Sequence, residues 1–225
     1  VAIVGESGSG KSITARAVLG LLPHGLRATG EVTLNGQSLG GLSPAGLRKL
    51  RGTEIALVMQ NPFTILNPFQ RVGVQLTATL RDQHGRRLRR AERRREAVRR
   101  LAEVGISDST VADLYPFELS GGMCQRVAIA AAVAEKPRVL IADEATTALD
   151  VTTQREILEL LDRLRVEHEL GMVLITHDLR VAFSFCDRVH VMYAGPVIEV
   201  ADADRMLTHP AHPYPATLLL ADPPM

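Results

Sequence analysis

The feature that most constrains this chain is its opening stretch, VAIVGESGSGKS, in which a short apolar run leads into a glycine-rich loop. Residues 1–4 have the character of a buried strand, and residues 12–22 have the apolar spacing of an amphipathic helix. A glycine-rich loop between a strand and a helix is the setting in which such loops bind phosphate. The opening therefore predicts a nucleotide-binding protein.

The loop GESGSGKS fits the pattern G-x-x-x-x-G-K-[ST]. Its glycines let successive backbone N–H groups point at phosphate oxygens, and the following helix adds its positive N-terminus. Lys11 is expected to reach the outer phosphates, and Ser12 to place its hydroxyl on Mg²⁺. The alternative is a glycine-rich turn that binds nothing. The predicted phosphate-binding residues are Gly5, Glu6, Ser7, Gly8, Ser9, Gly10, Lys11 and Ser12.

A second motif, VLIADE at residues 139–144, ends an apolar run with two acids. The run predicts a buried parallel strand, and Asp143 at its end is the candidate for the Mg²⁺ shell. Glu144 is expected to point the other way, because side chains alternate along a strand, and so to orient and polarise the attacking water. The alternative is a pair of acids that only caps the strand.

Strands and helices alternate through the rest of the chain, which predicts an α/β fold with a mainly parallel sheet. Pro196 is expected to interrupt the second strand of a hairpin, which restricts that strand to a sheet edge. Turn residues are Asn35-Gly36 and Ala194-Gly195. We expect strands at residues 31–34, 55–59, 138–143 and 172–176, helices at 125–134 and 154–167, and the hairpin at 189–200.

The segment 81–100 is strongly basic, with ten arginines against three acids. Nucleic-acid binding is one interpretation, and a helix with solvated arginines is the other. The second is favoured, because the whole chain has a net charge of only +1 and no aromatic residues interleave with the arginines, so no nucleic-acid partner is expected. The apolar residues placed on one face of this helix are Leu88, Val98, Leu101 and Ala102.

Residues 119–123, LSGGM, form a glycine turn before a predicted helix, which makes a second anion site. With this motif the chain resembles the nucleotide-binding subunits of ABC transporters. The resemblance implies a head-to-tail dimer that sandwiches two ATP molecules, with the LSGGM motif of one subunit closing over ATP held by the other. The residues implied to act in trans are Leu119, Ser120, Gly121, Gly122 and Met123.

Three further positions match motifs of that family in the same order. Gln60, in VMQNP, matches a glutamine that contacts Mg²⁺ and reports nucleotide state to the membrane domains. Asp150, in ALD, matches the loop that communicates across the dimer, and His177, in ITHD, matches the histidine that holds the γ-phosphate. The resemblance thus implies Glu144 and His177 as catalytic residues, ATP on residues 5–12, and Mg²⁺ near Ser12, Gln60 and Asp143.

Three segments narrow the resemblance to importers of oligopeptides, dipeptides, nickel and related solutes: NPFTILNP, ADEATTALDVTTQ and HPAHPYPATLL. The implied function is an ATPase that powers such an importer from the cytoplasmic face of the cell membrane, as a peripheral protein. Its implied partners are membrane permease subunits, docked near residues 63–69, and a second ATPase subunit, identical or homologous. A solute-binding protein would act indirectly. The solute itself is not specified.

The expected organisation is a single ABC ATPase domain over residues 1–225. Within it, residues 1–72 and 135–200 form the catalytic core and an antiparallel β subdomain, 73–134 a helical signature subdomain, and 201–225 an importer-type tail. One alternative is a soluble ABC ATPase that acts on ribosomes or DNA, or one half of a longer two-domain ATPase. Another is a nucleotide-binding regulator without turnover, which the presence of Glu144 and His177 disfavours.

Two departures from the family pattern give further expectations. Because strands and an adenine-stacking aromatic residue precede the loop in that family, Val1 is not expected to be the natural start, and the strand near residues 32–34 is expected to lack its partners. Cys124 follows Met123 of the LSGGM motif, at a position where the family usually has arginine or glutamine. It is expected to remove a polar contact at the dimer face.

Overall fold

The computed structural model describes residues 1–81, 84–147 and 149–221, and its chain divides into two compact units. The first unit comprises the described parts of Val1–Ala56, Arg138–Glu144 and Gly171–Met225. The second comprises those of Leu57–Pro137 and Ala145–Leu170.

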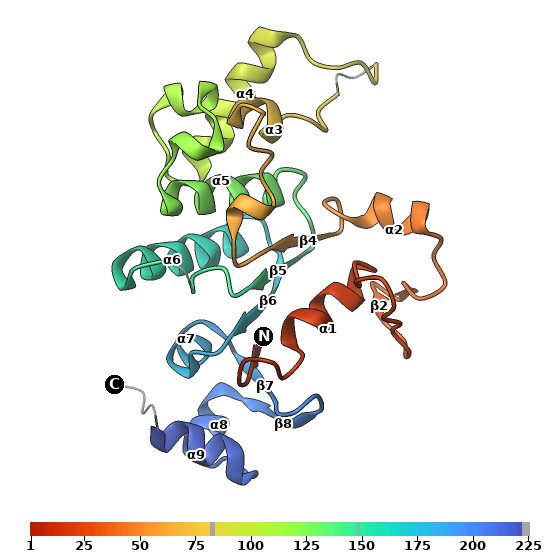
Figure 1. Ribbon diagram of the computed structural model, residues 1–225, viewed down its shortest axis with the longest axis vertical. Helices are drawn as coiled ribbons and strands as arrows, with labels where there is room; N and C mark the ends of the chain where they lie inside the picture. Colours follow the sequence, from red (N-terminus) through yellow and green to blue (C-terminus); the bar gives the residue numbers. More distant parts are fainter. Residues whose placement is uncertain (82–83, 148, 222–225) are drawn as a thin grey trace. The chain divides into compact units, whose positions relative to one another are not determined.

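A six-stranded sheet in the order β4-β5-β6-β1-β7-β8 forms the centre of the first unit (Figure 1). The pairs β5–β6, β6–β1 and β1–β7 are parallel, and β7–β8 is antiparallel. This is the mainly parallel α/β core that the alternation of strands and helices predicts. The strands are β1 (Ala2–Val4), β4 (Ile55–Val58), β5 (Val139–Asp143), β6 (Gly171–Thr176), β7 (Arg188–Met192) and β8 (Val197–Asp202).

Five helices belong to the first unit, and α1 is shorter than the predicted helix at residues 12–22. It ends at Val18 because Leu19 caps it and Gly20 adopts the left-handed region with φ 62°. Leu19 is 4% exposed, so its side chain packs inside the unit although it lies beyond the helix. The helices are α1 (Lys11–Val18), α2 (Pro44–Leu50), α7 (Leu179–Phe185), α8 (Ala203–Thr208) and α9 (Pro213–Ala221).

Two hairpins form at the predicted turns. The strand near residues 32–34 pairs with the segment that follows it, because β2 (Thr33–Leu34) is antiparallel to β3 (Gln37–Ser38) across Asn35-Gly36, at φ 51° and 78°. Pro196 does not interrupt β8, which begins at Val197. Instead it lies in the turn, where its carbonyl accepts a hydrogen bond from Tyr193 N at 3.1 Å. Its missing N–H therefore costs no ladder bond.

The second unit is helical, apart from the last residues of β4, and packs around side chains that are fully buried, such as Leu101, Ile129, Ile157 and Leu161. The helices α3, α4 and α5 contact one another, and α5 also contacts α6 (Figure 1). Its elements are η1 (Pro62–Thr64), α3 (Val72–Leu76), α4 (Arg90–Glu103), η2 (Ser109–Asp113), η3 (Pro116–Glu118), α5 (Gly121–Val133) and α6 (Val151–Glu167).

The arginine-rich segment forms its helix later than its apolar pattern suggests. Leu88 precedes α4, and Ala102 is exposed, so neither belongs to the buried face; Ala97 and Leu101 do. Arg100 is 3% exposed and donates to the Leu76 carbonyl and to Glu96. The prediction of solvated arginines is therefore wrong for Arg100, whose charge is buried and paired.

No helix within residues 1–81, 84–147 and 149–221 is long and apolar enough to cross a lipid bilayer. The most apolar helix of the first unit, α9, has nine residues.

Candidate active site

The loop at residues 5–12, called the phosphate loop below, turns from β1 into α1 and depends on glycine at three positions. Gly5, Gly8 and Gly10 have φ of 151°, 83° and 99°, where residues with a side chain are strained. A Cβ on Gly5 would also lie 2.1 Å from the carbonyl oxygen of Met192. The glycines are therefore required by the shape of the backbone.

Lys11 lies buried under this loop with 4% of its surface exposed. Its ammonium donates to the carbonyls of Gly5 at 2.8 Å and Glu6 at 2.9 Å, and it lies 3.9 Å from Glu144 Oε1. The loop's own carbonyls thus hold the ammonium in place, and the positive charge remains within the loop. This is the arrangement expected for a point charge that serves phosphate oxygens.

Ser12 and Asp143 meet although 131 residues separate them in the sequence, since the Ser12 hydroxyl donates to Asp143 Oδ1 at 2.7 Å. Asp143 is 4% exposed. Its burial raises the pKa of the carboxyl, while the hydrogen bond from Ser12 lowers it and the neighbouring Glu144 raises it. A cation beside a carboxylate this buried stabilises its ionised form.

Glu144 and His177 approach each other beyond the ends of two adjacent strands. Asp143 is in register with Ile175, β6 ends at Thr176, and Nδ1 of His177 lies 3.7 Å from Glu144 Oε1. Strand alternation does not govern the direction of the Glu144 side chain, because β5 ends at Asp143 and Glu144 has a φ of 48°. A non-glycine residue in this region stores strain, which is typical of functional sites.

Ser12 and Asp143 fit a nucleotide with Mg²⁺. A hydroxyl and a carboxylate oxygen are the hard donors that Mg²⁺ prefers, and in most such sites substrate phosphates complete the shell. In the described part of the chain no group of three His, Cys, Asp or Glu side chains could hold a metal by itself. The Ser9 hydroxyl is also buried in the loop with no hydrogen-bond partner among the described residues, so the loop retains an unused polar atom.

The LSGGM motif, residues 119–123, and Asp150 lie together in the second unit. Ser120 caps α5, because its hydroxyl accepts from the Met123 N–H at 3.3 Å, and Asp150 caps α6 by accepting from the Thr153 N–H at 3.0 Å. A Cβ on Gly122 would lie 2.9 Å from Thr153 Cγ2, so the two helix starts are adjacent. Ala148, in the same ALD motif as Asp150, lies outside the described residues.

The remaining predicted residues of this unit have distinct settings. Leu119 is 8% exposed and anchors the start of the signature, whereas Gly121 is exposed. Gln60 is exposed two residues after β4. These residues belong to a different unit from the phosphate loop, Asp143, Glu144 and His177.

Cys124 does not lie on a surface, which corrects the expectation of a lost contact at the dimer face. Its side chain is fully buried, and its thiol donates to the Pro116 carbonyl at 3.2 Å. Burial raises the pKa of this thiol to about 11, so it stays protonated at neutral pH.

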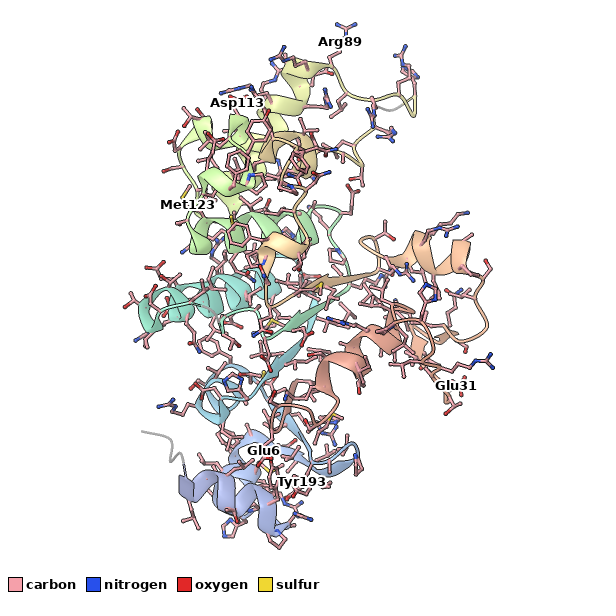
Figure 2. The ribbon with its side chains drawn as sticks, in the orientation of Figure 1. Glu6, Glu31, Arg89, Asp113, Met123 and Tyr193 are labelled. Carbon is pink, nitrogen blue, oxygen red and sulfur yellow. The ribbon has the colours of Figure 1, made fainter. Side chains whose placement is uncertain are left out.

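Sequence reasoning missed Tyr214, which the structure brings to the phosphate loop from α9. Its hydroxyl oxygen accepts a hydrogen bond from Glu6 N at 3.2 Å, and its ring packs on Tyr193 with centroids 4.4 Å apart. Glu6 and Tyr193, the two residues that it contacts, are labelled in Figure 2. Burial raises the pKa of Tyr214. The motif HPAHPYPATLL marked this segment as a family feature, but no local pattern indicates a partner 208 residues away.

The segment that carries Tyr214 is itself anchored to β8. The Glu199 carboxylate accepts from the backbone N–H groups of Ala211 at 2.8 Å and His212 at 2.9 Å, and His212 Nδ1 accepts from Tyr214 N at 3.1 Å. The tyrosine therefore reaches the loop from a held position.

Known proteins are similar to this chain over most of its length. The family model described as ABC transporter matches residues 1–147. The dipeptide transport ATP-binding protein DppD of Escherichia coli is 45% identical over 99% of this chain and 68% of its own length. The oligopeptide transport ATP-binding protein OppD of the same organism is 46% identical over 98% of this chain and 65% of its own. The chain thus spans about two thirds of these relatives.

Solved structures are similar over most of the chain. The ATP-binding cassette MJ0796, in a dimeric post-hydrolysis state with ADP and Pi, has a TM-score of 0.76 at 32% identity, covering 90% of this chain and 84% of that one. The protein cbiO1 from Clostridium perfringens, described as part of the ABC transporter complex cbiONQ, has a TM-score of 0.76 at 28% identity over 99% and 83%. They confirm the predicted fold class. With the phosphate loop, the acid pair and this family match together, the chain belongs to the ABC transporter family and is one of its ATPases, with ATP and Mg²⁺ as cofactors.

Proposed function

We propose that this chain is the ATP-binding and ATP-hydrolysing subunit of an importer for peptides or a related small solute. The observation that carries the solute class is the similarity to DppD and OppD, at 45% and 46% identity over nearly the whole chain. A putative peptide import ATP-binding protein of Brucella abortus is similar at 46% over 98% of the chain. The grouping of Lys11, Ser12, Asp143, Glu144 and His177 in one unit supports the ATPase role.

Binding depends on residues 5–12. The N–H groups of the loop and the start of α1 hold phosphate oxygens, and the Lys11 ammonium exchanges the Gly5 and Glu6 carbonyls for the outer phosphates. Ser12, Asp143 and Gln60 would hold Mg²⁺. When bound, the ion neutralises charge that develops on the phosphates during transfer.

Glu144 accepts a hydrogen bond from the attacking water and takes its proton as the water oxygen bonds to the γ-phosphorus. The bond from the γ-phosphorus to the bridging β–γ oxygen breaks, and ADP leaves with that oxygen. The distances from Glu144 Oε1 to Lys11 Nζ, 3.9 Å, and to His177 Nδ1, 3.7 Å, support this role. His177 donates from its imidazole to the γ-phosphate and limits the movement of Glu144. Positioning and charge stabilisation supply the rate, because the protein forms no covalent bond with the phosphoryl group.

A second ATPase subunit completes the site in a head-to-tail dimer. Residues 119–123 at the start of α5 face the nucleotide of the partner subunit, and Asp150, which caps the adjacent α6, communicates between the two sites. The organisation into a core over residues 1–72 and 135–200, a helical subdomain over 73–134 and a tail over 201–225 belongs to the same proposal.

Membrane permease subunits select the solute, together with a solute-binding protein, so the chain works as a peripheral subunit on the cytoplasmic face of the membrane. The permease docks on residues 63–69. Three apolar side chains support this surface, because Phe63, Ile65 and Phe69 are 49%, 38% and 87% exposed.

The test is ATP-driven uptake of a labelled dipeptide by the transporter assembled in membrane vesicles. The Glu144→Gln variant should assemble and bind ATP but import nothing, whereas the exposed Glu31→Gln control should import at the parent rate. Robust ATP hydrolysis without uptake of dipeptides, oligopeptides or Ni²⁺ would refute the importer assignment while leaving the ATPase intact.

A further inference from the structure

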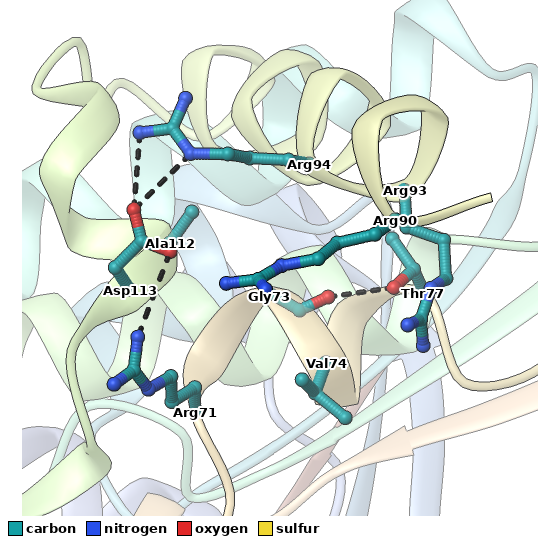
Figure 3. A pocket seen from close by; sticks show the side chains of 9 residues that line it. All are labelled: Arg71, Gly73, Val74, Thr77, Arg90, Arg93, Arg94, Ala112 and Asp113. Atoms are coloured by element: carbon teal, nitrogen blue, oxygen red, sulfur yellow. Dashed lines mark hydrogen bonds and ion pairs between the residues drawn. The ribbon is translucent and has the colours of Figure 1, made fainter.

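We propose that the second unit holds a binding site for a phosphate ester, in a pocket between α3, η2 and the first turns of α4 (Figure 3). The pocket has a volume of about 570 Å³, and its charged lining consists of four arginines and one aspartate. We call it the arginine pocket, after Arg71, Arg90, Arg93 and Arg94. The proposal goes beyond ATP hydrolysis and import and depends on neither.

The charge of the arginine pocket is unbalanced. Asp113, the single acid among the described lining residues, accepts from Arg94 Nε at 3.1 Å and Nη2 at 3.0 Å, and its other oxygen lies 4.0 Å from Arg71 Nη1. One carboxylate thus serves two guanidinium groups, and the lining keeps an excess of three positive charges. Such an excess attracts a multivalent anion.

Arg90 and Arg93 provide the uncompensated donors. In Figure 3 their side chains extend from α4 toward Gly73 of α3 and Thr77, which caps that helix. Neither guanidinium has a hydrogen-bond or ion-pair partner among the described residues, and Nε of Arg93 is closed to solvent. Arg90 is exposed to solvent, whereas the Nε–H of Arg93 has lost water and gained no acceptor, which is costly. A phosphate group offers the paired oxygens that a guanidinium fork matches.

The backbone around these arginines is already in place. A Cβ on Gly73 would lie 2.8 Å from the Ala112 carbonyl oxygen and 3.3 Å from Ala97 Cβ, so α3 packs closely against η2 and α4. The Arg71 guanidinium lies 5.8 Å from the centre of the Tyr115 ring, and Arg94 is held by Asp113. The start of α4 adds the partial positive charge of a helix N-terminus.

The shape of the pocket favours an organic phosphate over a bare ion. Its volume lies in the range of small-molecule sites, and Val74 and Ala112 add apolar surface beside the arginines. The phosphate would lie against Arg90 and Arg93, with the carbon part of the ester against Val74 and Ala112. Two sources supply this chemistry: a free phosphorylated metabolite and the headgroup of an anionic phospholipid.

The experiment uses the full chain with Lys11→Ala, which disables the phosphate loop as a competing site. Glycerol 3-phosphate is titrated by calorimetry, and binding to phosphatidylglycerol vesicles is compared with binding to phosphatidylcholine vesicles. Added to this background, R90Q with R93Q should weaken binding roughly 10-fold or more, because charge-assisted hydrogen bonds are lost. The matched control R95Q removes an exposed arginine of α4 that does not line the pocket, and should change binding less than about 2-fold.

Each outcome decides the proposal once thermal unfolding has shown that the variants are folded. Selective loss of glycerol 3-phosphate in R90Q/R93Q supports a metabolite site, and selective loss on phosphatidylglycerol alone supports a lipid headgroup. Equal losses in R95Q and R90Q/R93Q would indicate general electrostatics and overturn the site. The proposal also fails if Lys11→Ala abolishes all binding, or if R90Q/R93Q binds both probes like the parent.

Discussion

The phosphate loop of the first unit and the arginine pocket of the second both offer positive charge to an anion, but they are built from different parts. In the loop the donors are backbone N–H groups, and glycines such as Gly5 and Gly8 keep side chains out of the way. In the pocket the donors are the side chains of Arg90 and Arg93, supported by close packing at Gly73. A backbone site therefore depends on conformation, and a side-chain site on packing and charge balance.

The largest effect is expected at Glu144, which separates binding from turnover in the first unit. Glu144→Gln keeps the shape but removes the base, so the turnover rate should fall about 10²–10⁴-fold while ATP binding persists. Steady-state ATP hydrolysis and equilibrium nucleotide binding measure the two quantities. Glu31→Gln serves as the control, and turnover by Glu144→Gln near the parent rate would exclude Glu144 as the base.

The dependence of the loop on conformation can be tested by comparing two glycines. Gly5→Ala places a methyl group 2.1 Å from the Met192 carbonyl, so the free energy of unfolding should fall by about 3 kcal/mol or more. The methyl group of Gly8→Ala meets no atom within 4 Å. The free energy of unfolding should therefore fall by only about 1–2 kcal/mol, the cost of placing alanine at a φ of 83°. Chemical denaturation measures both. Equal losses would show that close packing at Gly5 does not matter.

Replacing Asp143 measures how much its ionised carboxylate destabilises the fold when no cation is bound. Because its pKa is raised in the folded state, its ionised form destabilises the fold, and this cost appears as pH rises above its ordinary value of 3.8. Asp143→Asn should therefore raise the free energy of unfolding at pH 7 by about 0.5–2 kcal/mol and weaken Mg²⁺-dependent ATP binding.

The gain from Asp143→Asn should disappear as the pH falls toward 3.8 and below, where both folded and unfolded carboxyls are protonated. Thermal unfolding across this range without nucleotide measures it. A gain that is the same at every pH would assign the effect to packing rather than to charge.

The smallest effect is expected at Tyr214, where a side chain supports the backbone site. Tyr214→Phe removes the acceptor for Glu6 N but keeps the ring against Tyr193, so KM for ATP should rise about 2–10-fold with little change in kcat. Tyr193→Phe is the matched control, since its hydroxyl has no hydrogen bond to the loop. A change in kcat alone, or equal changes in both variants, would contradict a positioning role.

Much of the first unit was predictable because its signals are local. The strand, the glycines and Lys11 follow one another within 12 residues, and VLIADE ends a buried strand. The setting of Glu144 was not predictable in the same way, because the periodicity of a strand says nothing about the residue after its last pair. The buried face of α4 was also missed in part, since the arginine-rich pattern contains too few apolar residues to mark it.

The sequence by itself determined the family, the phosphate loop and the two acids, because each depends on residue types at short, fixed spacings. Tertiary structure alone decided which distant groups meet: Ser12 with Asp143, Tyr214 with Glu6, and Gly122 with Thr153. It also decided that Arg100 is buried and that Arg90 and Arg93 have no acidic partner among the described residues. The physical reason is that charge compensation and close packing depend on three-dimensional neighbours, which local periodicity does not encode.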